Sequence, residues 1–275
     1  MAVVAQKITD QFAAYQGDCC EVIPDLPDES VGLSIFSPPF SDLYCYSDSP
    51  KDMGNSRSYS QFFEHFTFLA TELHRVTMPG RIVAVHCMDL PIHKRDGGDI
   101  AMRDFPGDLI QAFQDAGFLY HCRICIWKDP LLAAVRTKAI GLAHKQIVKD
   151  SSVCRVGIAD SLLVFRKKGE NPKPIKHPSG LKTYYGATSM PKELDRFDGW
   201  EEPKTNKRSH WIWQQYASPV WTDIRQTRVL PYRDGREDDD MKHICPLQRD
   251  VVSRCLVLWS AKGDNVLSPF MGIGT

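Results

Sequence analysis

Apolar and polar positions along this chain follow two alternating patterns. Residues 31–36 form an apolar run that ends abruptly at two prolines, which is typical of a buried parallel strand followed by a loop. Residues 59–73 place aromatic and aliphatic side chains at helical spacing, so we predict an amphipathic helix that stops at Met78-Pro79-Gly80. Further strands are predicted at 81–87, 118–127 and 161–165, and a helix at 107–116.

This succession of strands and helices predicts an α/β fold with a mostly parallel sheet and right-handed crossovers. The same reasoning gives a short strand at 12–16 and a short helix at 19–26 near the start. Near the end it gives a helix at 247–259 and a short strand at 265–267. Open sheets of this kind bind their ligands at the carboxyl ends of the strands, so we expect the site where the run 31–36 ends.

Periodicity is lost after residue 165. Residues 166–208 instead gain Pro, Gly, Lys and Tyr, which indicates an inserted module. The charge distribution singles out an overlapping region. The net charge of the 275 residues is zero, yet residues 121–208 hold 18 Lys and Arg against 9 Asp and Glu, and the remainder holds 16 against 25. A basic middle fits either a solvated lysine-rich surface or a nucleic-acid partner.

Other features of the composition narrow the class of protein. No apolar run reaches eighteen residues and the first ten residues lack the layout of a secretory signal, so we expect an intracellular, cytoplasmic protein with no membrane partner. The nine cysteines are scattered within apolar segments, which suits reduced thiols. Cys122 and Cys125 form a C-x-x-C without a second pair at zinc spacing, so no metal site is predicted.

The segment Ser37-Pro38-Pro39-Phe40 carries candidate chemistry. Two successive prolines fix the backbone in a rigid extended form where the chain leaves the sheet. The Ser37 hydroxyl oxygen and the Pro38 carbonyl could bind the two hydrogens of an exocyclic base amine, whose lone pair is otherwise delocalised into the ring. Phe40 offers a stacking face for a base flipped out of a duplex. Read alone, such a segment is more often an ordinary turn.

A second candidate segment is the glycine loop at 270–275, after the predicted strand 265–267. Gly272 and Gly274 would let the backbone approach a ligand closely. The loop lacks the third glycine and the downstream acidic residue of a dinucleotide fingerprint, which disfavours hydride transfer.

Taken in order, these segments resemble the permuted, beta-class DNA amino-methyltransferases that modify N4 of cytosine or N6 of adenine. The resemblance covers nearly the whole chain. It rests on the segments 17–19, 26–31, 37–40, 78–81, 126–130, 220–221, 243–247 and 263–275.

The resemblance implies a Rossmann-like methyltransferase sheet, S-adenosylmethionine as cofactor, double-stranded DNA as partner and a restriction-modification setting in a bacterial or phage-infected cell. It assigns residues 1–165 to the catalytic part, 166–216 to an inserted target-recognition region and 217–275 to the start of the cofactor-binding part. Serine at position 37 favours cytosine N4 over adenine N6.

By the same resemblance, each candidate site residue receives a role. The catalytic and base-stacking positions are Ser37, Pro38, Pro39 and Phe40. The cofactor-binding positions are Asp18, His243, Pro246, Phe270, Gly272, Gly274 and Thr275. The candidate DNA contacts are Lys128, Arg166, Lys167, Lys168, Tyr184 and Tyr185. Asp18 can equally be a turn residue or helix cap, and His243 a structural histidine.

Three departures from the family pattern are visible. Ser268 stands where an aspartate is usual, the start of the segment 243–247 is interrupted, and the chain stops at Thr275, directly after the glycine loop. We therefore expect a truncated chain or a part supplied elsewhere. Three alternatives stay open, namely adenine methylation, a catalytically impaired DNA-binding relative, and methylation of RNA or a protein glutamine. Cytosine C5 chemistry is disfavoured because the chain has no Pro-Cys pair.

Overall fold

The computed structural model describes residues 3–41, 52–92, 101–137, 140–197, 205–231 and 246–275. Its centre is a six-stranded sheet with the strand order β10-β3-β4-β8-β7-β9. In that order the strands comprise Val266–Leu267, Val31–Phe36, Thr77–Met88, Asp160–Lys167, Phe118–Ile126 and Val220–Trp221. Neighbouring strands are parallel except β8, which is antiparallel to both β4 and β7. The predicted Rossmann-like α/β fold with a mostly parallel sheet is confirmed.

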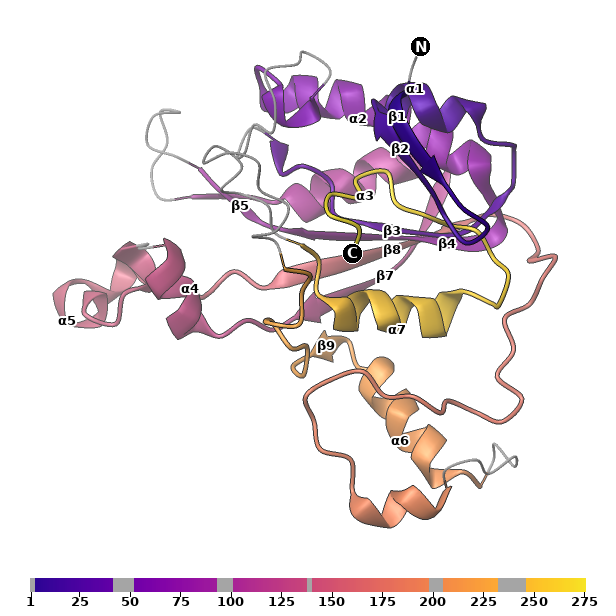
Figure 1. Ribbon diagram of the computed structural model, residues 1–275. Helices are drawn as coiled ribbons and strands as arrows, with labels where there is room; N and C mark the ends of the chain where they lie inside the picture. Colours follow the sequence, from indigo (N-terminus) through magenta and orange to yellow (C-terminus); the bar gives the residue numbers. More distant parts are fainter. Residues whose placement is uncertain (1–2, 42–51, 93–100, 138–139, 198–204, 232–245) are drawn as a thin grey trace.

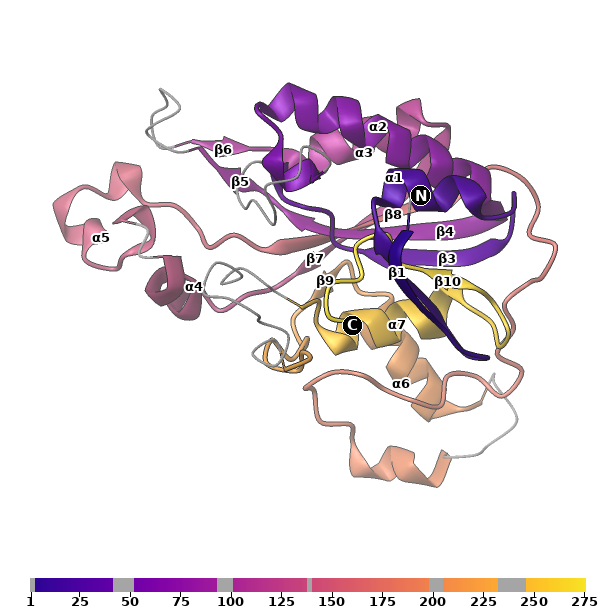
Figure 2. The ribbon, with the colours of Figure 1, turned by 45° about the horizontal axis from the view of Figure 1, so that its top comes forward.

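Helices cover both faces of this sheet (Figures 1 and 2). The helices α2 (Tyr59–Val76) and α3 (Phe105–Asp115) lie on one face and α7 (Arg249–Trp259) lies on the other. Alternate residues of β4 therefore enter two different apolar clusters, Val83 on the α2 side and Ala84 on the α7 side. Covering on both faces also explains why β3 is buried along its whole length and reads as a continuous apolar run.

Helix α2 follows its predicted pattern closely. The Ser58 side chain caps it by accepting from the Gln61 N–H at 3.2 Å. Of its aromatic stripe, Phe62 and Phe66 are fully buried, while Tyr59 and Phe63 are partly buried. The helix ends at Val76, and the chain becomes extended at Thr77 and runs directly into β4. The predicted stop at 78–80 thus forms the first part of the strand.

The N-terminal strands lie outside the main sheet. The predicted strand at 12–16 corresponds to β2 (Ala13–Gly17), which pairs antiparallel with β1 (Val3–Ile8), a strand that the sequence reading did not predict. The short helix α1 (Cys19–Val22) and one 3-10 turn, Ile23–Asp25, then lead toward β3. A second small pairing joins β5 (Leu90–Pro91) to β6 (Met102–Arg103).

Two parts of the chain extend beyond the layered core. Between β7 and β8, α4 (Pro130–Thr137) and α5 (Gln146–Lys149) project away from the sheet (Figure 1). Within the segment 166–216, α6 (Lys207–Tyr216) packs against α7 through its own apolar cluster, which includes Ile212 and Tyr216. Within the described parts of the chain, none of the helices has the length and apolar character that crossing a membrane requires.

Candidate active site

The Ser37–Phe40 segment lies at the carboxyl end of β3, as predicted. The Ser37 hydroxyl donates to the His86 main-chain carbonyl at 2.9 Å, and the His86 ring nitrogen Nδ1 lies 3.5 Å from the same oxygen of Ser37. Pro38 is buried, whereas Pro39 and Phe40 are partly exposed. The Phe40 ring packs edge-on against Phe105, with centroids 6.1 Å apart, so the ring is held in place while part of it stays accessible.

The backbone directly after this segment is strained. Ser41 is fully buried and has a φ of +53°, a left-handed conformation that a residue other than glycine rarely adopts. Such strain persists only where the surroundings impose it, and it is concentrated at functional sites.

A chain of polar groups continues inward from Ser37. His86 lies in β4, and its Nε2 is 3.0 Å from Oδ2 of Asp160, the first residue of β8. The second carboxylate oxygen of Asp160 lies 2.5 Å from the Lys128 Nζ, just beyond the end of β7. Burial by itself raises the pKa of Asp160, but its interactions with His86 and Lys128 outweigh this effect and hold that pKa below its ordinary value. Four neighbouring strands thus contribute one polar group each to a single edge of the sheet.

The glycine loop reaches the same edge. Strand β10 runs parallel to β3 with Leu267 beside Ser34, and the Phe270 ring lies against Phe36 at a centroid distance of 5.8 Å. Gly274 has a φ of +89°, a conformation that favours glycine. A Cβ added at Gly272 or Gly274 would meet no atom within 4 Å, so the backbone is open on that side. The structure therefore brings the two predicted motifs together.

Of the other predicted cofactor positions, Asp18 acts as the N-cap of α1, because its Oδ1 accepts from the Cys20 N–H at 2.9 Å. A helix cap is the structural role that the sequence left open for Asp18. The cap uses Oδ1 alone and does not need the second carboxylate oxygen of Asp18. Pro246 lies three residues before Arg249, the first residue of α7, and this end of the helix faces the edge of the sheet where β3 ends. His243 lies outside the described residues.

The predicted DNA contacts are not brought together. Lys128 lies at the edge that carries Ser37. Arg166 pairs with Ile82 and therefore lies at the opposite edge of the sheet, next to Lys167 and the exposed Lys168. The Lys167 ammonium is largely buried and bonds to Glu29 at 3.2 Å, which is a structural role.

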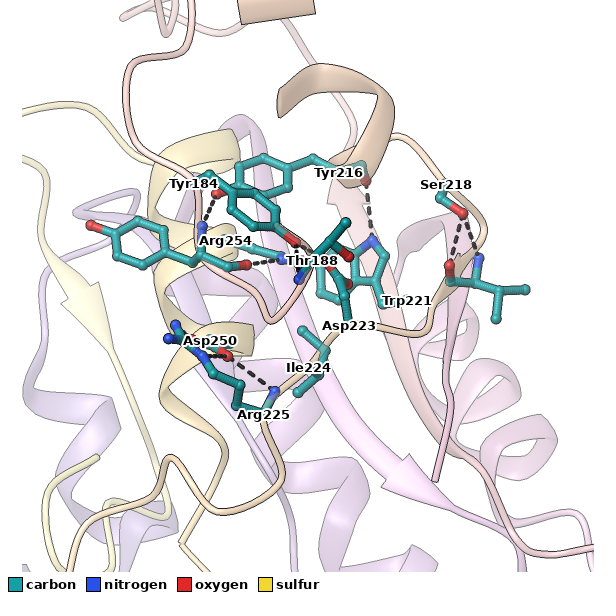
Figure 3. A network of polar contacts seen from close by, with 12 residues as sticks. Tyr184, Thr188, Tyr216, Ser218, Trp221, Asp223, Ile224, Arg225, Asp250 and Arg254 are labelled. Atoms are coloured by element: carbon teal, nitrogen blue, oxygen red, sulfur yellow. Dashed lines mark hydrogen bonds and ion pairs between the residues drawn. The ribbon is translucent and has the colours of Figure 1, made fainter. Parts of the chain in front are cut away.

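Tyr184 and Tyr185 belong to a polar network that connects the segment 166–216 to α7. Figure 3 shows Tyr184, Asp223 and Arg254 of this network. The Tyr184 hydroxyl donates to the Asp223 carboxylate, and the fully buried Arg254 donates to Asp223 at 2.6 Å and to the Tyr185 carbonyl at 2.7 Å. The Arg254 guanidinium also lies over the Trp221 ring, 4.8 Å from its centroid. These contacts connect residues 184 and 185 to Asp223 and to α7 beside the central sheet.

Sequence reading missed His86 and Asp160. His86 interrupts an apolar strand near its end, and Asp160 opens another apolar run. A polar residue near the end of a buried strand is the signal that could have found both, since neighbouring strand ends share one edge.

The sequence of this chain is similar to that of a known protein family. The model of the "DNA methylase" family N6_N4_Mtase matches residues 31–275. The type II methyltransferase M.MthZI of Methanothermobacter thermautotrophicus is 23% identical over 91% of this chain and 64% of its own length. M.BglI of Bacillus subtilis is 21% identical over 95% of this chain and 76% of its own length. The chain thus spans less than two thirds of M.MthZI.

Among solved structures, the Thermus thermophilus protein TTHA0409 complexed with S-adenosyl-L-methionine has a similar fold. Its TM-score is 0.55 at 20% identity, over 94% of this chain and 80% of that one. The similarity of fold agrees with the match to the family model, and the chain belongs to the N6/N4 DNA methylase family.

Proposed function

We propose that this chain transfers a methyl group from S-adenosylmethionine to the exocyclic amine of a base flipped out of double-stranded DNA, with N4 of cytosine as the target. The observation that carries the proposal is the placement of Ser37–Phe40 beside the open glycine loop at one edge of the sheet. Family membership supports DNA as substrate and S-adenosylmethionine as cofactor.

The hydrogen bonding of Ser37 suits it to bind an amine. A hydroxyl has a single hydrogen, and that of Ser37 is directed to the His86 carbonyl. Its lone pairs alone therefore face an incoming group, so Ser37 is an acceptor for an amine N–H. A second acceptor at the Pro38 carbonyl would hold the other hydrogen and favour a tetrahedral nitrogen with an available lone pair.

Phe40 provides the face on which the flipped base would stack, because its ring is fixed by Phe105 yet partly exposed. The glycine loop suits the methionine part of the cofactor, since Gly272 and Gly274 leave room that a side chain would fill. When bound, S-adenosylmethionine supplies a methyl group on a positively charged sulfur. Asp18 and Phe270 complete the set of residues that would hold it.

The segment 166–216 is the target-recognition region of this proposal. It is basic in sequence and is fixed to α7 by the Arg254 network, so that bases bound there would keep a constant position relative to Ser37. We assign residues 1–165 and 217–275 to the catalytic and cofactor-binding parts of one domain.

The test is transfer of labelled methyl groups from S-adenosylmethionine to a pool of DNA duplexes. Ser37→Ala should lower the rate about 100-fold, the effect of removing one polar group that stabilises a transition state. The matched control is Ser30→Ala, at the other end of β3, whose hydroxyl likewise donates to a carbonyl, that of Pro27, at 2.7 Å. Cofactor affinity should be unchanged in both variants. No transfer by the unaltered chain, or equal rates for Ser37→Ala and Ser30→Ala, would refute the proposal.

A further inference from the structure

An amine that gains a methyl group must lose a proton, and the Ser37 hydroxyl is too weak a base to keep it. We propose that His86 accepts this proton through Ser37 and that Asp160 is the positioning residue that keeps His86 ready to do so. This inference rests on the proposed function and adds a proton acceptor to it.

The side chains of Ser37, His86 and Asp160 follow one another in that order, with His86 in the middle. Ser37 Oγ lies 3.5 Å from His86 Nδ1, and His86 Nε2 lies 3.0 Å from the Asp160 carboxylate. A carboxylate facing Nε2 favours the tautomer that carries its hydrogen there, which leaves the Nδ1 lone pair toward Ser37. The arrangement has the same order of groups as a Ser-His-Asp triad, in which the carboxylate orients the imidazole and stabilises its charged form.

Burial strengthens this assignment. Asp160 is 1% exposed and His86 is 7% exposed. Among the described residues, neither His86 Nε2 nor Asp160 Oδ2 has a hydrogen-bond partner, and the two atoms lie 3.0 Å from each other. A buried carboxylate is costly unless it is paired, and here Lys128 keeps Asp160 ionised at 2.5 Å. The ionised carboxylate is what a positively charged imidazole would require.

The proton transfer balances as follows. The bond between nitrogen and the methyl carbon forms, and the bond between that carbon and sulfur breaks with its electron pair going to sulfur. The nitrogen releases one proton to Ser37 Oγ. At the same time the Ser37 hydroxyl turns away from the His86 carbonyl and transfers its own hydrogen to His86 Nδ1. The resulting imidazolium faces Asp160 and then releases its proton to water.

The kinetic test measures single-turnover methylation, so that product release does not hide the chemical step. His86→Asn keeps a polar group near Ser37 but has no base, and it should lower the rate about 100-fold to 10,000-fold. The affinities for DNA and cofactor should stay within about threefold, because the residue is assigned to proton transfer and not to binding. His86→Ala should regain part of its rate on addition of imidazole, which a purely structural histidine would not allow.

The control is His74→Asn. His74 is a partly buried histidine packed edge-on against Phe118, away from Ser37, and its replacement should leave the rate unchanged. Asp160→Asn should lower the rate in the same direction as His86→Asn. A normal rate for a folded His86→Asn variant, with methylation by the unaltered chain intact, would overturn the relay and leave the proposed function standing.

A second readout does not depend on activity. Nitrogen-15 NMR of histidine-labelled protein distinguishes protonated from unprotonated ring nitrogens. We expect His86 to carry hydrogen on Nε2 with Nδ1 free, and Asp160→Asn to abolish that preference. A hydrogen on Nδ1 of the unaltered protein at neutral pH would overturn the proposal even if no methylation were detected.

Discussion

The contact between Arg254 and Asp223 should hold the segment 166–216 on the central sheet, and we expect its removal to lower the free energy of unfolding strongly. Arg254 is completely buried, and Asp223 is 8% exposed. Arg254→Met keeps much of the side-chain volume but leaves the Asp223 carboxylate without its buried cation. Removing one partner of such a pair costs about 3–5 kcal/mol. Against a total stability of about 5–15 kcal/mol for a typical domain, this is a large loss.

The cost arises mainly from the charge that is left behind, and a double variant separates this from lost packing. Asp223→Asn combined with Arg254→Met removes both charges, so the double variant should be less destabilised than the sum of the two single variants. The difference should be about 0.5–3 kcal/mol, the range for contacting residues in one hydrogen-bond network.

The assay is urea unfolding followed by tryptophan fluorescence, since Trp221 lies directly beneath the Arg254 guanidinium. Arg249→Met, an exposed position on the same helix, should change the free energy of unfolding by less than about 0.5 kcal/mol. A loss below about 1 kcal/mol for Arg254→Met, or strict additivity in the double variant, would show that the buried pair of Arg254 and Asp223 does not stabilise the fold in this way.

Three further predictions concern other parts of the molecule. Burial raises the pKa of Asp250, but hydrogen bonds from Arg225 and Arg228 outweigh this and hold it at about 2, below the ordinary 3.8, so its stabilisation is complete well above pH 3.8 and is lost as the pH falls toward 2. Asp250→Asn should therefore cost about 2 kcal/mol at pH 7 and about 1 kcal/mol at pH 3 in urea unfolding, and equal costs would contradict this. Gly274→Val should weaken S-adenosylmethionine binding at least about tenfold in calorimetry, because the φ of +89° is strained for valine and its side chain enters the open space; unchanged affinity would argue against the loop as the cofactor site. Phe40→Ala should weaken duplex DNA binding about tenfold in a competition assay through lost base stacking, while cofactor affinity stays the same; an unchanged DNA affinity would exclude the stacking role.

The sequence predicted best those elements that carry a continuous apolar run or stripe. Strand β3 and helix α2 were found close to their observed limits because one is apolar throughout and the other carries a continuous apolar stripe. The antiparallel direction of β8 and its place between β4 and β7 could not be predicted, since hydrophobic periodicity carries no strand direction. Helix α6 was missed because its exposed face is rich in basic and polar residues, and a small apolar face alone packs on α7.

The residues of the candidate site also differ in whether a local sequence pattern could identify them. The Ser37–Phe40 segment and the glycine loop were visible because each is contiguous in sequence and follows a predicted strand. His86 and Asp160 are far apart in the sequence and approach each other only through the pairing of β4 with β8, so no local pattern joins them. Lys167 was predicted as a DNA contact, but its ammonium pairs with Glu29 at the edge of the sheet opposite Ser37, and this pairing is set by the tertiary fold.

If a base amine beside Ser37 receives the methyl group, nucleoside mass spectrometry should detect the product. Duplex DNA treated with this chain and S-adenosylmethionine would be digested and its methylated nucleosides identified by fragmentation. We expect N4-methylcytosine, which should disappear with Ser37→Ala. N6-methyladenine would move the target to the other amine that the family modifies and contradict the cytosine assignment. Methyl at cytosine C5, or no methylated nucleoside, would contradict the amine mechanism itself.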